Sequence, residues 1–191
     1  MSLSLPALAT QTHECAMAIT AADFEQIVRR YQRKVYRVLL LMLKNPEDAD
    51  NLTQECFLRA YTSMQSFRGE CSVQTWLLRI AVNLARDHAR NRRVGFWKRL
   101  VRLDDGGVVT AGHEPASVRP SPERGMLASE ELDAVWRAVD TLSARQKEVF
   151  ILRFAEEMEL KEIADVLKLR TGTVKAQLFR AVTSVREQVR G

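Results

Sequence analysis

The sequence is poor in cysteine, glycine and proline, and each shortage argues against a class of structure. Its 191 residues include 3 Cys, 8 Gly and 5 Pro. Cys15, Cys56 and Cys71 are widely spaced and form no Cys-x-x-Cys pair or Cys/His cluster, which argues against a zinc site and a disulfide framework. An odd number of cysteines without a framework fits a reducing cytosol. Scarce glycine and proline favour helices over sheet.

Long hydrophobic runs and catalytic groupings are missing too. The longest apolar run, Val38–Leu43, is far too short to cross a bilayer, so no direct membrane insertion is expected. The stretch 1–20 lacks the pattern of a secretory signal and is expected to be a loose tail. His13, His88 and His113 are scattered, with no nucleophile–base pair, glycine-rich phosphate loop or metal spacing. No enzyme activity, cofactor or metal is therefore expected.

Positive charge is in excess, and it is unevenly placed. The formal net charge is +5. Residues 1–103 carry 16 Lys and Arg against 9 Asp and Glu, whereas residues 104–191 carry 13 against 15. Basic residues dominate again from Lys168 to the C-terminus. Two separate basic stretches on one helical chain suggest a nucleic acid contacted at two places.

The segment 75–93, TWLLRIAVNLARDHARNRR, combines two stripes at helical spacing. The apolar stripe, suited to burial, consists of Trp76, Leu77, Ile80, Ala81 and Leu84. The polar and basic stripe consists of Arg79, Asn83, Arg86, Arg90 and Arg93. Arginines at this spacing can follow a polyanion, and an asparagine among them can pair with a base edge. A basic stripe can equally be a solvated helix face, so the segment alone does not decide between the two.

The helix predicted over 47–64 carries an acidic patch within the basic half of the chain. Asn45-Pro46 precedes it and ends the helix predicted over 21–43. The face opposite its apolar stripe carries Asp48, Asn51, Gln54 and Glu55. The helix dipole explains acids in the first turn but not Glu55, whereas a positively charged partner surface explains all of them.

Two stretches are predicted to be irregular. The first, 66–74, is a polar loop with a glycine hinge, and Ser72 or Thr75 is expected to cap the helix that follows it. A loop of this kind before a basic helix is a place where an unstacked base could be held, although the loop alone is a weak signal. The second, 104–122, gathers glycine and proline with little periodicity and is predicted to be an interdomain linker.

The C-terminal third predicts a helix-turn-helix unit. A short helix over 160–167, a turn over 168–170 and a longer basic helix from 171 to about 189 have the expected lengths. The residues expected to face the core are Val174, Leu178, Ala181 and Val185. Those expected to face outward are Lys175, Ala176, Phe179 and Arg180. An ordinary α-hairpin in a helical bundle would show the same pattern, so this alternative stays open.

Four motifs stand in one order at one spacing. They are NPEDADNLTQECFLRAY, FRGE, TWLLRIAVNLARD and LSARQKEVFILRF, the last followed by LKEIADVLKLRTGTVKAQLFRA. Together, over about 23–93 and 130–188, they resemble bacterial RNA polymerase sigma factors of the extracytoplasmic-function (ECF) group. The resemblance implies an all-α fold of two small helical domains. These are a region 2-like domain at 21–97 and a region 4-like helix-turn-helix domain at 125–191, joined by a flexible linker at 98–124.

The same resemblance implies a function and its partners. Such a protein works in the cytoplasm, binds core RNA polymerase, directs it to promoter DNA and helps to open the duplex. An anti-sigma factor is a further expected partner, and a stress or envelope regulon is the expected target. The rival hypothesis, a stand-alone helix-turn-helix regulator, accounts for the last helix but leaves the acidic helix and the Asn83 helix unexplained.

The resemblance also assigns residues to these partners. The positions matching the polymerase dock are Asp48, Asp50, Gln54 and Glu55. Those matching the minus-ten DNA site are Arg68, Gln74, Trp76, Arg79, Asn83, Arg86 and Arg90. Those matching the minus-thirty-five reader are Thr173, Lys175, Ala176, Phe179 and Arg180. Within the minus-ten set, Asn83 matches a position lining the pocket for flipped bases, and the three arginines of its helix are expected to hold phosphates.

Some positions depart from the family pattern. The departures are Asn51 for an acid, Glu159 for a Ser cap, Lys168 for a turn Gly, Ala176 for Ser and Gln177 for Arg. The first is expected to weaken polymerase docking slightly. Lys168 raises the possibility of a strained turn. The last two lie on or beside the DNA-reading face, so the family's usual upstream motif is not expected here.

Overall fold

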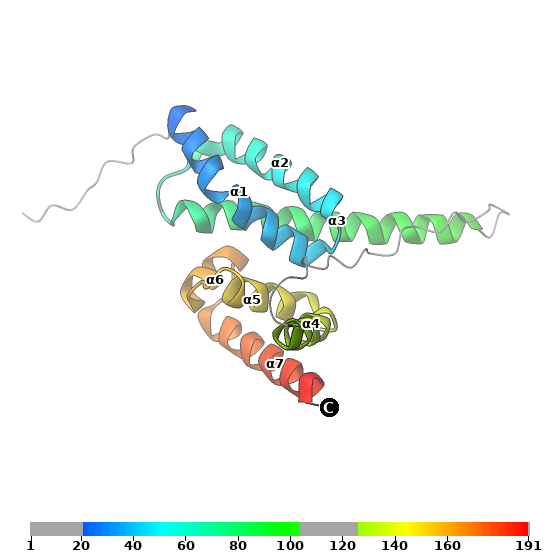
Figure 1. Ribbon diagram of the computed structural model, residues 1–191. Coiled ribbons are helices and arrows are strands. Elements are labelled where there is room, and N and C mark those ends of the chain that lie inside the picture. The colour runs from blue at the N-terminus through cyan, green and yellow to red at the C-terminus, as the bar shows by residue number, and fades with distance from the viewer. Residues whose placement is uncertain (1–20, 104–125, 191) are drawn as a thin grey trace, which may run out of the picture.

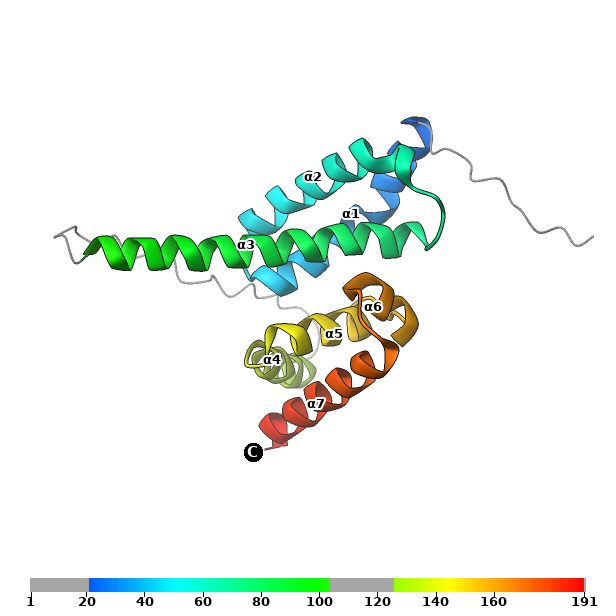
Figure 2. The same ribbon diagram turned by 180° about the vertical axis from the view of Figure 1, so that it is seen from behind.

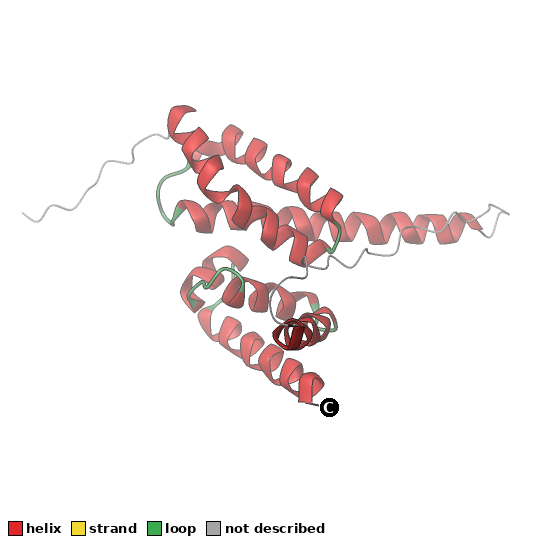
Figure 3. Cartoon of the chain, viewed as in Figure 1, coloured by secondary structure: helices red, strands yellow, loops and turns green. Residues whose placement is uncertain are grey.

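The computed structural model describes the backbone of residues 21–103 and 126–190, and the side chains of 23–94 and 132–190. These residues form α-helices and one short 3-10 helix, with no strand among them (Figure 3). The elements are α1 (Ala21–Leu43), α2 (Pro46–Ser63), η1 (Met64–Ser66), α3 (Val73–Leu103), α4 (Met126–Asp140), α5 (Ala144–Phe154), α6 (Leu160–Leu167) and α7 (Thr171–Arg190). The predicted all-α fold is confirmed. The predicted tail at 1–20 and most of the predicted linker at 98–124 lie outside the described residues, and α3 continues past position 97.

Helices α1, α2 and α3 pack against one another as the first bundle (Figure 1). The predicted break between α1 and α2 is confirmed, because the Asn45 side chain accepts a hydrogen bond from the Asp48 backbone N–H at 3.1 Å and Pro46 occupies the first turn. Ser72, rather than Thr75, caps α3, since its Oγ accepts from the Thr75 backbone N–H at 3.1 Å. The predicted apolar stripe of α3 is confirmed: Leu77, Ala81 and Leu84 are buried, and Trp76 and Ile80 pack against the same core.

Helices α4 to α7 form the second bundle, with α5 at its centre. The α5 side chains from Glu148 to Leu152 are all buried, because the helix contacts α4, α6 and α7 as well as α1 of the first bundle. A capping interaction closes its start, with the Ser143 backbone N–H donating to Gln146 Oε1 at 3.1 Å. Two large apolar residues of this bundle are exposed, Leu132 at 52% and Phe154 at 53%.

Helices α6 and α7 form the predicted helix-turn-helix. The last turn of α6 closes with a hydrogen bond from the Leu169 backbone N–H to the Ala164 carbonyl at 2.9 Å. Lys168 takes the left-handed conformation there, at φ 53° and ψ 50°. A residue with a Cβ is disfavoured in this region, so the turn is strained at the position where the family has glycine.

Lys168→Gly is therefore expected to stabilise the second bundle. Removing the Cβ relieves a steric cost of about 1 kcal/mol, part of which is offset by the greater freedom of glycine in the unfolded chain. The melting temperature, followed by circular dichroism, should rise by about 1–3 °C. Arg186→Gly is the control, because Arg186 is exposed in the regular part of α7 and glycine there should lower the melting temperature. If Lys168→Gly melts at a lower temperature than the unmodified protein, the left-handed backbone of Lys168 is not strained.

The two bundles lie one against the other. Figures 1 and 2, which view the molecule from opposite sides, show α1 and α3 facing α5 and α6, while α7 lies on the far side of the second bundle. The side of α3 that meets α6 is therefore separate from the side that packs on α1 and α2. Leu78 and Val82, outside the predicted stripe, are also buried.

Candidate nucleic-acid and polymerase interfaces

The predicted polar face of α3 is present, and one part of it is exposed to solvent while another part is partly buried. Asn83, Arg90 and Arg93 are exposed, whereas Arg79 and Arg86 are partly buried. Among the described residues, the Asn83 side chain receives only a long hydrogen bond, 3.5 Å from Arg86 Nη1 to its Oδ1, and this leaves its amide nitrogen available to a ligand. Arg90 pairs with Asp87 at 2.9 Å, an exposed contact of little strength.

The loop before α3 lines a cavity of about 500 Å³. The residues around it include Phe67, Arg68, Cys71, Trp76 and Arg79. The rings of Phe67 and Trp76 pack with their centroids 4.8 Å apart, which fixes the loop against the start of α3. Three predicted site residues, Arg68, Trp76 and Arg79, therefore meet at one hollow. Asp165 of α6 completes the wall of the cavity.

Gln74 lies in the first turn of α3 and is tied to α1. Lys34 Nζ donates a hydrogen bond to Gln74 Oε1 at 2.9 Å. This bond joins residues 40 positions apart and holds the amide in one orientation. The Gln74 amide nitrogen stays available as a donor.

The two cysteines among the described residues have different surroundings. Cys56 is fully buried, its Sγ is 3.6 Å from the Leu77 carbonyl, and burial raises its pKa to about 12. Cys56 is therefore a small core residue. Cys71 is half-buried at the cavity, and burial raises its pKa too, although the nearby Arg79 acts in the opposite direction. No cluster that could hold a metal ion occurs within the described side chains.

The acidic face of α2 is on the outside of the molecule. Asp50 and Gln54 are exposed and share a 3.3 Å hydrogen bond. Glu55 pairs with Arg59 on the same helix at 2.7 Å. Asp48 differs, because it lies between α2 and α3, with its side chain 25% exposed and its carboxylate 3.5 Å from both His88 Nε2 and Arg92 Nη1.

Two apolar residues extend the acidic face, and the sequence analysis did not select them. Leu58 is 62% exposed and Tyr61 is 49% exposed. They follow Gln54 by one and two helical turns, so they share its side of α2. Exposed apolar side chains beside charged ones are typical of a protein-binding surface. Their position off the buried stripe was the signal that could have identified them.

The outward face of α7 agrees with the prediction. Thr173, Lys175, Ala176, Phe179 and Arg180 are all exposed, and Phe179 reaches 72%. Val174, Ala181 and Val185 are buried on the opposite face, which holds α7 on the bundle. An exposed aromatic ring flanked by basic residues can contact the edges and methyl groups of bases in a major groove.

Comparison with known proteins explains this combination of faces. The family profile described as Sigma-70 region 2 matches residues 27–106, and that described as Sigma-70, region 4 matches residues 132–185. The RNA polymerase sigma-H factor of Pseudomonas aeruginosa is 32% identical over 160 residues, covering 83% of this chain and 81% of that protein. The ECF RNA polymerase sigma-E factor of Haemophilus influenzae is 33% identical over 168 residues, covering 87% of each chain. This chain belongs to the ECF group of sigma factors.

Two solved structures have the same fold, and one of them is described as a sigma factor. RpoE of Bartonella quintana, in complex with the anti-sigma factor NepR, superposes with a TM-score of 0.67 at 22% identity, covering 89% of this chain and 98% of that one. CnrH, in complex with the cytosolic domain of CnrY, superposes with a TM-score of 0.62 at 22% identity, covering 88% of each chain. The sigma factor described here thus has two helical domains, region 2 (α1–α3) and region 4 (α4–α7).

A sigma factor is the subunit that directs core RNA polymerase to promoters, so this chain acts in transcription initiation. A stand-alone helix-turn-helix regulator does not account for the region 2 match or for the relatives that align with both domains. Among the described residues, no helix has both the length and the apolar character needed to cross a membrane.

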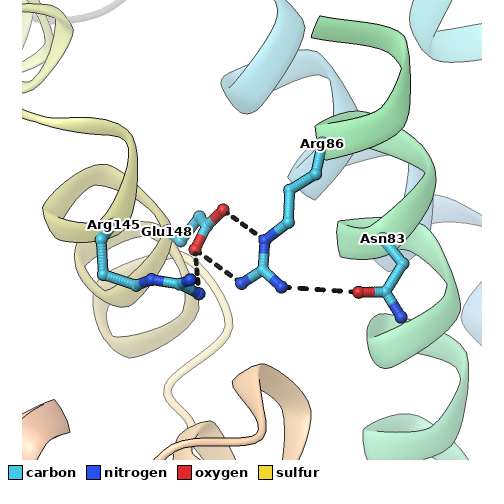
Figure 4. Close-up of polar contacts among 4 residues, drawn as sticks. All are labelled: Asn83, Arg86, Arg145 and Glu148. Atoms are coloured by element: carbon cyan, nitrogen blue, oxygen red, sulfur yellow. Dashed lines mark hydrogen bonds and ion pairs between the residues drawn. The ribbon is translucent and has the colours of Figure 1, made fainter. Parts of the chain in front are cut away.

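The partly buried arginines of region 2 are held by region 4. Figure 4 shows Glu148 of α5 accepting from Arg86 of α3, with Nε–Oε1 at 2.7 Å and Nη2–Oε2 at 2.8 Å. Arg145 donates to the same carboxylate at 3.1 Å. The hydrogen bond to Glu148 raises the pKa of Arg86, although burial acts against it. Arg79 Nε donates to the Asp165 carbonyl of α6 at 3.2 Å. Two of the predicted phosphate-binding arginines are therefore engaged within the protein.

Proposed function

We propose that the Asn83 face of α3 and the loop over residues 67–74 capture unpaired bases of the minus-ten element. The supporting observation is the exposed Asn83 amide, which lies between Arg79, Arg86 and Arg90 and on the helix that begins at the Trp76 cavity. Flipping a base out of a duplex costs a few kcal/mol, and a fitted pocket with stacking and hydrogen bonds offsets this cost. Arg68 and Gln74 complete the site at the loop, and the arginines hold the backbone phosphates.

The second part of the proposal is that the outer face of α2 docks on core polymerase. Asp50, Gln54 and Glu55 supply the polar contacts, and Leu58 supplies an apolar anchor beside them. The Asp48 side chain, which is 25% exposed, lies at the edge of the dock. Its contacts with His88 and Arg92 orient α2 on α3. Asn51 is exposed on the same face, so the loss of an acid there reduces the charge of the dock.

The third part concerns α7, which we assign to the minus-thirty-five element in the major groove. Its exposed residues are Thr173, Lys175, Ala176, Phe179 and Arg180. Arg180→Ala is expected to weaken binding to the upstream element by about 1–3 kcal/mol if the guanidinium reads a base. The loss of binding free energy is measured by titrating holoenzyme with duplexes that differ at single upstream positions. A loss that is the same for every duplex would show a phosphate contact instead.

Regulation by an anti-sigma factor belongs to the same proposal. One sigma factor with this fold, RpoE of Bartonella quintana, is described in a complex with the anti-sigma factor NepR. Together with the family membership, this supports an anti-sigma partner for this chain. Cytoplasmic work beside polymerase, a non-enzymatic role and control of a stress or envelope regulon are further parts of the proposal. We retain residues 21–97 and 125–191 as the proposed functional domains.

One experiment tests the proposed function as a whole. Start sites mapped after overexpression identify candidate promoters, and a promoter fragment is then titrated with the purified protein, alone and with core polymerase. Specific binding and transcription are expected only with core polymerase. Tight specific binding of the duplex by the free protein would favour a stand-alone regulator.

A further inference from the structure

Lys34 of α1 reaches the first turn of α3, in the part of the chain that we assign to the minus-ten element. Its Nζ donates a hydrogen bond to Gln74 Oε1 at 2.9 Å, and both residues are partly buried. Lys34 forms no ion pair with a carboxylate among the described side chains. The ammonium group of Lys34 is therefore directed at an amide rather than at an acid.

The chemistry of lysine fixes which way round the Gln74 amide lies. An ammonium group has three donors and no acceptor, so only the oxygen of an amide can bond to it. Rotating the amide by half a turn would place its N–H donors against Nζ and lose the bond. A hydrogen bond to a charged donor favours the first orientation by a factor of about 10 or more. Gln74 therefore keeps Nε2, a donor, on the side of the amide away from Nζ.

The packing of α1 on α3 does not depend on this bond. The two helices share an apolar core that includes Val35 and Leu39 of α1 and Leu77 of α3, all three almost completely buried. One partly buried hydrogen bond adds little to a core of this size. Its main consequence is the direction of the Gln74 amide.

An amide donor held in one direction distinguishes two classes of base. Thymine and guanine carry a keto oxygen, O4 or O6, that accepts a hydrogen bond, whereas cytosine and adenine carry an amino group, N4 or N6, that donates one. A glutamine that turns both ways can serve either class, and it can form a paired contact with N6 and N7 of adenine. With Oε1 turned toward α1, that paired contact is lost.

We propose that Lys34 is a positioning residue of the minus-ten site, which holds Gln74 Nε2 toward the DNA so that position 74 selects a base with a keto oxygen. This selection rests on the proposed function of the 67–74 loop and of α3. Gln74 is not part of the wall of the cavity beside Trp76, so the base that it reads is separate from any group held there. Lys34 acts through Gln74 and does not itself contact the base.

A phosphate contact is the competing role for a lysine in this place. Arg30 and Arg33 are exposed on the same helix, so α1 offers positive charge whether or not Lys34 orients Gln74. The two roles have different consequences. A phosphate contact strengthens binding of every sequence alike, whereas an oriented amide changes the order of preference among the bases at one position.

The test uses the full chain, assembled with core polymerase, on a mapped promoter whose minus-ten positions are changed one at a time to each of the four bases. Open complexes are counted in competition between these templates. Gln74→Ala should reduce the preference for T or G over A or C at one position, by about tenfold. Lys34→Met removes the donor and nearly keeps the side-chain length, and it should reduce the same preference at least about fivefold. Added to Gln74→Ala, it should change that preference no further.

Two control variants separate orientation from charge. Lys34→Arg keeps a charged group that only donates, so it should retain the preference. Arg33→Met removes the same charge from the neighbouring exposed position, and it should lower the binding of all templates by a similar factor without changing the preference. Because the preference is a ratio between templates in one mixture, a smaller fraction of folded protein does not alter it.

The outcomes distinguish the positioning role from the site itself. If Gln74→Ala alters the preference but Lys34→Met lowers the binding of all templates alike, as Arg33→Met does, the positioning role is overturned and the site stands. If Gln74→Ala alters the preference at no position, Gln74 does not read a base, and the proposal fails together with the site assigned to the loop. A preference of the unmodified protein for A or C at the position that responds to Gln74→Ala would also overturn the proposal, because a fixed donor does not favour an amino group.

Discussion

Glu55→Lys is expected to weaken binding of the sigma factor to core polymerase by about 3 kcal/mol, or about 150-fold. Glu55 lies on the outer face of α2 beside Gln54, and the reversal places a positive charge where the proposed dock needs a negative one. Within the protein the change breaks only the exposed pair with Arg59, which is worth about 0.5 kcal/mol. Binding should therefore suffer far more than stability. Fluorescence anisotropy with labelled sigma factor and core enzyme measures the affinity.

The control for this change is Glu187→Lys, the same reversal at an exposed acid of α7. It should leave the affinity for core polymerase nearly unchanged, and circular dichroism should show both variants folded. If Glu55→Lys binds core polymerase as tightly as the unmodified protein, the acidic face of α2 is not the docking site.

Asn83→Ala is expected to slow promoter melting about 100-fold, or about 2.7 kcal/mol, without changing the affinity for core polymerase. The amide of Asn83 can donate and accept at once, as the edge of a flipped base requires, and alanine can do neither. Asn83 is exposed and separate from the α2 face, so its loss does not touch the dock. Stopped-flow fluorescence of 2-aminopurine in the minus-ten element of a mapped promoter follows the melting.

Asn91→Ala is a matched control on the same helix, since Asn91 is exposed about two turns further along α3. It should melt the promoter at the normal rate. A similar defect in both variants, or an equal loss of melting and polymerase affinity in Asn83→Ala, would remove Asn83 from the base pocket.

Local features of the sequence predicted most of the fold. Helix boundaries followed from signals within a few residues, such as Asn45-Pro46 between α1 and α2 and Ser72 before α3. The buried faces of α3 and α7 followed from the spacing of apolar residues such as Leu77, Ala81 and Val174. These signals depend only on residues that are close in the sequence. They can therefore be interpreted without knowing how distant segments pack.

The contact between the two domains could not be predicted in this way. Arg86 and Glu148 are 62 positions apart, and Arg37 and Glu156 are 119 apart. Helical periodicity carries no information about which distant face a charged residue will meet. The apolar run directly after Glu148 was a partial signal, because a helix that is apolar on several sides is surrounded by other helices.

The same reason explains why helical spacing does not decide whether a single apolar residue is buried. Leu132 and Phe154 have apolar side chains at plausible helical spacing, but neither meets a covering helix and both are exposed. Conversely, Leu58 and Tyr61 were not recognised as surface residues of a candidate dock. Composition gives the number of apolar side chains, whereas the packing of whole helices decides which of them are covered.

Site-specific cross-linking in the reconstituted holoenzyme tests the division of labour between the two domains most directly. A photoreactive amino acid is placed at position 83 on α3 or at position 179 on α7, and the complex is irradiated on a mapped promoter. The account predicts that position 83 links to the non-template strand of the minus-ten element, and position 179 to the minus-thirty-five duplex. Links from position 83 to the upstream duplex, or to polymerase alone, would contradict it.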